Sequence, residues 1–165
     1  MVNMTENAGS VVDEETFSVR RTIRIAASID KVWRAVTEPE HISRWFGRTE
    51  LDGSGVGATG TMTFPDYGAI PLRVEAYEEP HLISYRWNND DALGGLPDAI
   101  DESTSTVFTF TLDEVDGGTQ LTVVETGFEL TSAPLKNLES HRTGWDEELD
   151  KMVALVESET AGGEA

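Results

Sequence analysis

The sequence has no cysteine and only three lysines among its 165 residues. The absence of cysteine excludes disulfides, thiolate metal sites, iron–sulfur clusters and thiol nucleophiles, and it suits a reducing compartment. No apolar run approaches the ~18 residues that a membrane-spanning helix needs. The first ten residues show neither the basic region nor the apolar stretch of a signal peptide. We therefore expect a cytoplasmic protein that does not insert into a membrane.

Positive charge is also scarce, because 12 Lys and Arg stand against 31 Asp and Glu, a formal charge of −19. Such an excess of negative charge repels nucleic acid, so we expect no nucleic-acid partner. Residues 17–48 hold seven bases and three acids, whereas residues 49–165 hold five bases and 24 acids. This asymmetry fits ordinary solvated faces. It also fits a bipolar surface that orients the protein against an acidic partner.

The length fits a single domain. Residues 1–15 and 158–165 are polar and poor in apolar side chains, so we expect two disordered tails around a domain at 16–157. Residues 17–26 alternate between apolar and polar side chains, which predicts a half-buried strand. Two short helices follow, the first capped by Ser28 and the second carrying Pro39 in its first turn.

Beyond these helices the apolar period changes to two, which predicts a series of strands. The strands are expected at 60–64, 71–77, 81–87, 106–112 and 119–126. Short connections favour an antiparallel meander, interrupted by a long acidic loop at 88–105. An apolar stripe from Leu138 to Val156 predicts a final helix of roughly 20 residues. These elements give an α+β class, in which a curved antiparallel sheet of six or seven strands carries the long helix across its concave face.

Three segments resemble the helix-grip superfamily, also called START-like, SRPBCC or pollen-allergen-like. Within it, they resemble the family named for the activator of heat-shock protein 90 ATPase homologue. The most specific segment is IAASIDKVWRAVT at 25–37, which runs directly into EPEHISRWFG at 38–47. The others are GTQLTVVETGF at 118–128 and HRTGWDEEL at 141–149. The resemblance covers residues 16–157.

This resemblance implies a hollow between the last helix and the sheet that accepts an apolar molecule. The superfamily includes lipid carriers, hormone receptors, polyketide aromatases and cyclases, and co-chaperone domains, so the fold does not select a function. We predict binding of a small apolar or aromatic ligand of lipid-like or polyketide-like character. The alternatives are a co-chaperone-like protein-interaction module and, third, a cyclase- or aromatase-type enzyme. Both a monomer and a homodimer are compatible with the sequence.

Inward-facing side chains of the predicted elements supply the candidate ligand-binding residues. They are Trp33, Trp45, Met62, Phe64, Leu72, Val74, Tyr85, Trp87, Phe108, Phe110, Glu125, Arg142, Trp145, Leu149 and Met152. Four tryptophans in one small core favour ligand walls as well as ordinary packing. Gly144 interrupts the final helix, and we expect it to permit close approach to the sheet or to a ligand.

Glu125 shares the parity of Leu121 and Val123, which aims it at the concave face. A buried carboxylate needs a partner. We expect Arg142 in that role first and Arg21 second; the alternative is that Glu125 turns to solvent near Gly127.

Other chemical signals are weak. The letters GVGATG at 55–60 match a dinucleotide fingerprint, but a strand follows where the phosphate-binding helix should begin. His41, His81 and His141 fall on different elements, which disfavours a metal site. The run at 88–91 lacks calcium-loop spacing and is expected at a solvated loop tip. We predict no catalytic residues, no metal and no cofactor.

The charge of −19 implies self-repulsion in the folded state. Because 1 M salt shortens the electrostatic screening length to roughly 3 Å, it weakens this repulsion. We therefore predict that the melting temperature rises with added sodium chloride. Thermal unfolding followed by circular dichroism at low and high salt measures this. A flat or falling curve would show that the acids are already paired or well separated.

Overall fold

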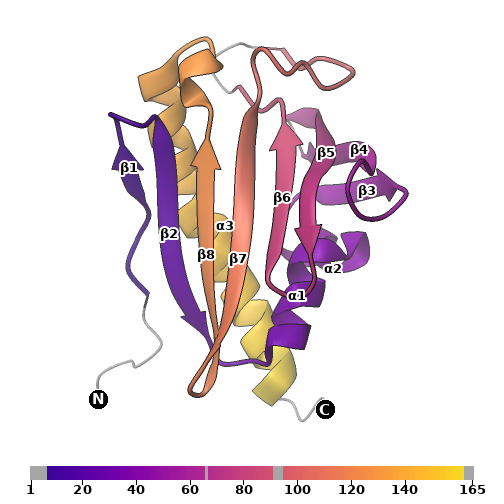
Figure 1. The fold of residues 1–165 in the computed structure, drawn as a ribbon, viewed down its shortest axis with the longest axis vertical. Helices are drawn as coiled ribbons and strands as arrows, with labels where there is room; N and C mark the ends of the chain where they lie inside the picture. Colours follow the sequence, from indigo (N-terminus) through magenta and orange to yellow (C-terminus); the bar gives the residue numbers. More distant parts are fainter. Residues whose placement is uncertain (1–6, 66, 91–94, 162–165) are drawn as a thin grey trace.

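The computed structural model describes residues 7–65, 67–90 and 95–161. Within these residues the chain forms one eight-stranded antiparallel sheet in the order β1-β2-β8-β7-β6-β5-β4-β3 (Figure 1). The strands are β1 Val11–Asp13, β2 Ser18–Ile25, β3 Arg48–Asp52, β4 Thr59–Phe64, β5 Gly68–Glu78, β6 Leu82–Trp87, β7 Thr106–Val115 and β8 Gly118–Thr126. The helices are α1 Ile29–Thr37, α2 Pro39–Trp45, the short 3-10 helix η1 Phe128–Leu130 and α3 Pro134–Ala161. The predicted α+β class and the helix-grip arrangement are confirmed.

Local sequence explains the first elements. Side chains of β2 alternate between buried and exposed, with Val19, Ile23 and Ile25 on the inward face. The Ser28 hydroxyl then caps α1 by accepting a hydrogen bond from the Lys31 amide at 3.3 Å. Pro39 occupies the first turn of α2, where its missing amide hydrogen costs no helical bond.

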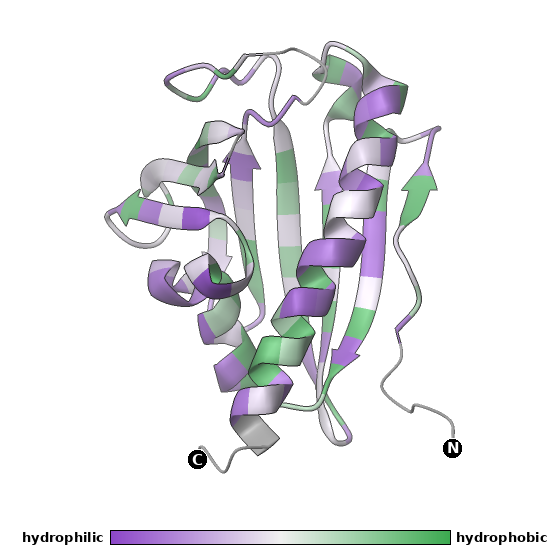
Figure 2. Ribbon diagram, turned by 180° about the vertical axis from the view of Figure 1, so that it is seen from behind, coloured by the Kyte–Doolittle hydropathy of each residue, from purple (hydrophilic) through white to green (hydrophobic). Residues whose placement is uncertain are grey.

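Helix α3 crosses the sheet, as Figure 2 shows from its own side. Its C-terminal half is the more hydrophobic part and buries Leu149, Met152 and Val156 almost completely. Trp145, near the middle, contacts the rings of Phe108 and Phe110 with centroids at 5.1 and 5.8 Å. The core of the domain therefore lies between the C-terminal half of α3 and the centre of the sheet. No helix in the described ranges is both long and apolar enough to cross a bilayer.

The sheet has more strands than the six or seven predicted, because β1 and β3 pair at its two edges. Strand β1 lies inside the segment expected to be a disordered tail, and α3 continues through residues 158–161 of the other expected tail. Residues 1–6 and 162–165 of those tails lie outside the described residues. Strand β1 has only three residues and β3 has Leu51 as its one apolar residue, so neither shows an apolar period of two and their pairing reveals them.

Arg21, on the inward face of β2, explains why the N-terminal segment is anchored. Its side chain is 4% exposed and donates to the carbonyl of Ala8 at 2.9 Å and to the carboxylate of Asp150 at 2.8 Å. It also donates to the carbonyls of Trp145 and Asp146. The expectation that Arg21 could pair with Glu125 is therefore wrong, because Arg21 joins the N-terminal segment to α3.

Candidate functional site

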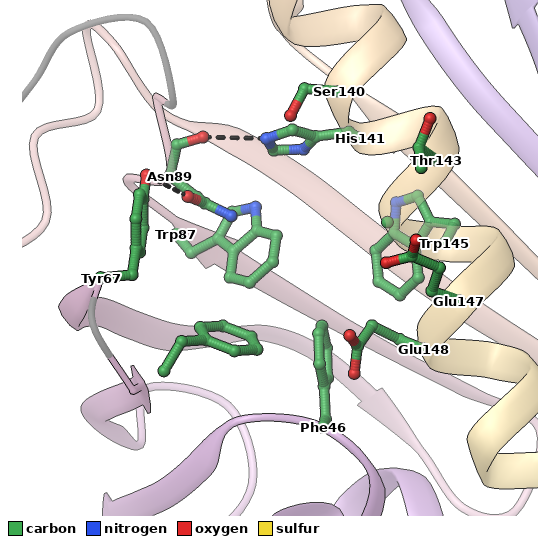
Figure 3. A pocket seen from close by; sticks show the side chains of 12 residues that line it. Phe46, Tyr67, Trp87, Asn89, Ser140, His141, Thr143, Trp145, Glu147 and Glu148 are labelled. Atoms are coloured by element: carbon green, nitrogen blue, oxygen red, sulfur yellow. Dashed lines mark hydrogen bonds between the residues drawn. The ribbon is translucent and has the colours of Figure 1, made fainter.

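An open pocket of about 510 Å³ lies between the N-terminal half of α3, the turn after α2, and the ends of β4 and β6. Five aromatic side chains, several small polar groups and two acids line it (Figure 3). The lining residues are Phe46, Phe64, Tyr67, Trp87, Asn89, Ser140, His141, Thr143, Gly144, Trp145, Glu147 and Glu148. Apolar walls with a few polar groups are typical of small-molecule sites.

The helix contributes through its periodicity. His141, Gly144 and Glu148 are three and four residues apart, so they share one stripe beside the buried Trp145. A Cβ placed on Gly144 would meet no atom within 4 Å. Of the two expectations for Gly144, close approach to the sheet is wrong, because this glycine borders the pocket instead; close approach to a ligand stays a prediction.

Phe46 forms the opposite wall. Its ring stacks on Trp45 with centroids 4.9 Å apart, and it meets the rings of Phe64 and Trp145 at 5.6 and 5.5 Å. The next residue, Gly47, could not carry a side chain in place, because a Cβ would lie 2.6 Å from Cγ of Met62. The missing side chain at Gly47 lets the turn after α2 fold onto the sheet and bring Phe46 to the pocket.

The carboxylate of Glu125, which is completely buried, lies directly behind the pocket wall. Its Oε1 accepts hydrogen bonds from His141 Nδ1 and Trp145 Nε1, both at 2.9 Å. Its Oε2 accepts from Trp87 Nε1 at 2.9 Å and from the Thr106 hydroxyl at 2.5 Å. Four donors from β6, β7 and α3 therefore satisfy one buried carboxylate, as a buried charge requires.

His141 carries the compensating charge. Its Nδ1 faces the Glu125 carboxylate and its Nε2 faces the main-chain carbonyl of Asn89 at 3.0 Å. While Glu125 is ionised both neighbours can only accept, so the two contacts suit a ring protonated at both nitrogens, an imidazolium. The site behind the pocket is a buried ion pair with no net charge.

This ion pair sets the acidity of Glu125. Burial alone would raise its pKa, but the charge and hydrogen bond of His141, with the hydrogen bonds of Thr106 and Trp87, more than offset that effect. The pKa of Glu125 therefore lies below its ordinary value of 4.5. The carboxylate stays ionised through the neutral range.

The predicted pairing of Glu125 with Arg142 is wrong, although the inward direction of Glu125 is correct. Arg142 is one-third exposed and pairs with Glu139 and Asp146 on its own helix. Adjacent helical residues are separated by 100°, so only one of His141 and Arg142 can face the sheet. His141, four residues before Trp145, takes that direction and supplies the cation.

The fifteen candidate ligand-binding residues separate into distinct groups in the structure. Phe64, Trp87 and Trp145 line the pocket, with Glu125 immediately behind it. Eight others are buried in the core and do not line the pocket: Trp45, Met62, Leu72, Tyr85, Phe108, Phe110, Leu149 and Met152. Trp33 and Val74 line a separate hollow of about 530 Å³ between α1 and β5. The pocket borders residues 140–148 of α3, and Leu149 and Met152, which were expected to line the cavity, are packed in the core beyond it.

Several pocket residues were not among the candidates, including Phe46, Tyr67, Asn89 and His141. The spacing of His141 from Trp145 was the available signal, since residues four apart share a helix face. Within the described chain, no three His, Asp or Glu side chains come together in a way that could hold a metal ion.

Asn88 and Asp90 are buried, contrary to the expectation of a solvated loop tip; residue 91 lies outside the described residues. The Asn88 side chain donates to the carbonyl of Asp101 at 3.0 Å and accepts from its amide at 2.8 Å. The Asp90 carboxylate accepts from the amide and hydroxyl of Ser132 and from Asn137. Asn89, held between them, presents its side-chain oxygen to the Tyr67 hydroxyl at 2.8 Å. This segment thereby fixes one wall of the pocket to the start of α3.

Replacing Glu125 with Gln should destabilise the protein by about 3–5 kcal/mol, because it leaves the His141 cation buried without a counter-charge. Both oxygens of the carboxylate accept hydrogen bonds, whereas the Gln amide has one oxygen and an NH2 group that cannot accept. Urea unfolding at neutral pH measures the loss, and Arg142→Met is the control that should stay within about 0.5 kcal/mol of the parent.

The same comparison has a pH dependence. The folded-state pKa of Glu125 is lowered, so its stabilising effect is complete above pH 4.5 and disappears as the pH falls below that value. The difference between the parent and Glu125→Gln should therefore shrink on acidification. A difference that is constant with pH, or a Gln variant as stable as the parent, would contradict the ion pair.

Comparison with solved structures identifies relatives with the same fold. Protein MLL2253 from Mesorhizobium loti is 25% identical, with a TM-score of 0.69 over 86% of this chain and 97% of that one. CalU16 from Micromonospora echinospora is 21% identical, with a TM-score of 0.65 over 96% and 90%. DynU16, from the dynemicin biosynthetic locus, is 24% identical with a TM-score of 0.65; the match covers 88% of this chain and 48% of DynU16.

No curated protein matches the chain. The sequence profile of the family described as "Activator of Hsp90 ATPase homolog 1-like protein" matches residues 26–157. This range includes both short helices, the six strands β3 to β8 and most of α3. The chain therefore belongs to the Activator of Hsp90 ATPase homolog 1-like family.

Proposed function

We propose that the protein binds a small apolar or aromatic molecule in the pocket between α3, Phe46 and the end of β6. The single observation that carries this proposal is an open hollow of about 510 Å³ with five aromatic side chains in its lining. Ring-lined hollows of this size fall within the ~300–1,000 Å³ typical of small-molecule sites. The lipid-like or polyketide-like character expected from the sequence fits these walls.

Polar groups at the rim provide orientation. The hydroxyls of Tyr67, Ser140 and Thr143 and the side chain of Asn89 all border the pocket. The hydroxyls of Tyr67 and Thr143 already donate, to Asn89 and to the carbonyl of Glu139, so they would meet a ligand by accepting from its hydroxyl. The fold shared with DynU16, from the dynemicin biosynthetic locus, agrees with a small-molecule role.

The ion pair argues against His141 as a general base. A general base needs a free lone pair, whereas both nitrogens of His141 already donate, one to Glu125 and one to Asn89. Cyclase activity and a chaperone-binding role stay alternative predictions. Neither has a specific geometric observation in its favour.

Filling the pocket from Gly144 tests the proposal. Gly144→Leu should place its side chain in the hollow without a backbone clash, because nothing lies within 4 Å of the added Cβ. We expect Gly144→Leu to lose at least about tenfold in affinity for the neutral fluorescent probe N-phenyl-1-naphthylamine, through direct steric exclusion. Probe fluorescence during titration with protein measures the affinity.

Gly144→Ala is the matched control, since it should raise the free energy of unfolding by about 1 kcal/mol and leave most of the pocket open. Ala154→Leu adds the same side chain at an exposed position of α3 and should not change binding. Equal affinity of Gly144→Leu and the parent, with both folded, would locate the probe elsewhere. If the parent protein binds neither this probe nor any compound of a panel of neutral aromatic molecules, the proposal is refuted.

A further inference from the structure

We infer that the ligand carries a positive charge, an amine or other organic cation attached to its apolar or aromatic body. This inference rests on the proposed function and concerns the same pocket. It follows from the charges around the pocket and from the nature of its walls.

The ionised groups of the lining favour a cation. Two of the lining residues, Glu147 and Glu148, are acids, and none is lysine or arginine. The third charged side chain, the His141 imidazolium, is compensated by Glu125 at 2.9 Å. Glu148 is likewise paired, with Lys151 at 2.9 Å, so Glu147 gives the lining its net negative charge. Glu148 adds to that charge once a ligand cation displaces Lys151, and both act more strongly in a partly enclosed space.

Glu148 is the acid best placed to contact a ligand. Its side chain is 19% exposed, and Figure 3 shows its carboxylate beside the ring of Phe46. Its ion-pair partner is Lys151, one turn further along α3, with Nζ 2.9 Å from Oε1. Lys151 is 59% exposed, so its ammonium can return to water at little cost when a ligand cation takes its place.

The aromatic walls reinforce this preference. The rings of Phe46, Trp87 and Trp145 lie within 6.4 Å of one another, centroid to centroid, and line the pocket together with Glu148; Phe46 is half-buried, and each tryptophan is 3% exposed. The face of an aromatic ring attracts an organic cation, and tryptophan does so most strongly. A ligand anion would gain nothing from these faces and would meet two carboxylates.

The whole molecule acts in the same direction. Its formal charge of −19 attracts cations at a distance and repels anions such as fatty acids. Long-range attraction changes mainly the rate of association. The selectivity inside the pocket is assigned to Glu148 and the aromatic rings.

Three probes with one aromatic body test the inference: naphthalene-2-methylamine, naphthalene-2-methanol and naphthalene-2-carboxylate. At neutral pH they are a cation, a neutral molecule and an anion. Isothermal titration calorimetry with the full chain should rank the amine first, about tenfold tighter than the alcohol, and the carboxylate last. Added salt should reduce the amine affinity more than that of the alcohol.

Variants assign the preference to the pocket. Glu148→Gln should remove most of the preference for the amine, so that the amine affinity falls about tenfold more than the alcohol affinity. Lys151→Gln should raise the amine affinity, because it removes the competing ammonium and keeps Glu148. Glu114→Gln is the matched control: it removes the same charge at an exposed position near the β7–β8 turn and should change neither affinity.

The outcomes separate the two proposals. If the alcohol binds as tightly as the amine, or the carboxylate binds tightest, the cation inference fails while small-molecule binding stands. If the amine is preferred equally by the parent and Glu148→Gln, the assignment to this site is overturned. If none of the three probes binds the parent protein, both proposals fail for this class of ligand body. An unchanged amine affinity in Lys151→Gln would contradict the competition between the two ammonium groups.

Discussion

The buried carboxylate of Glu125 is the interaction on which the site depends. Strand β8 supplies it, and its four hydrogen bonds reach Trp87 on β6, Thr106 on β7, and His141 and Trp145 on α3. Two of these donors are the indole groups that form the back of the pocket. A buried charge must be satisfied, so the carboxylate fixes the orientation of both rings as well as the position of the helix. The aromatic walls are consequently held by a polar group that no ligand needs to touch.

Around this centre, one end of the α3–sheet interface is solid and the other is open. The C-terminal half of the helix packs Leu149 and Met152 against the sheet with no exposed surface. Towards the N-terminal half, the helix has Gly144, whose missing side chain leaves space. The segment 88–90 lies beside this space and is joined to the helix by the hydrogen bond between His141 and the Asn89 carbonyl. The pocket is therefore a local interruption of a helix-grip core, bordered by a turn that needs Gly47 to close.

The period of two in the strands and the helical stripe were sufficient to predict the sheet, the helices and the inward direction of Glu125. They were not sufficient to predict strands β1 and β3. These strands have too few apolar residues to show a period of two, and they are defined by their pairing with β2 and β4. An apolar stripe on a helix is wide enough to include both His141 and Arg142. The sequence alone therefore does not show that His141, and not Arg142, is the partner of Glu125. The burial of Asn88 and Asp90 escaped prediction since both look like loop residues, and only the three-dimensional arrangement provides their partners. The position of the pocket depends on missing volume, which no periodicity reports.

The proposed ligand would lie against Trp87 and Trp145 and away from Trp33. The four indole N–H groups of the chain give separate signals in a proton–nitrogen correlation spectrum, and they can be assigned by single Trp→Phe replacements. On titration with a neutral naphthalene compound, the account predicts that the signals of Trp87 and Trp145 shift together and saturate, while that of Trp33, in the other hollow, stays in place. Shifts confined to Trp33, or a spectrum that does not change at saturating ligand, would contradict it.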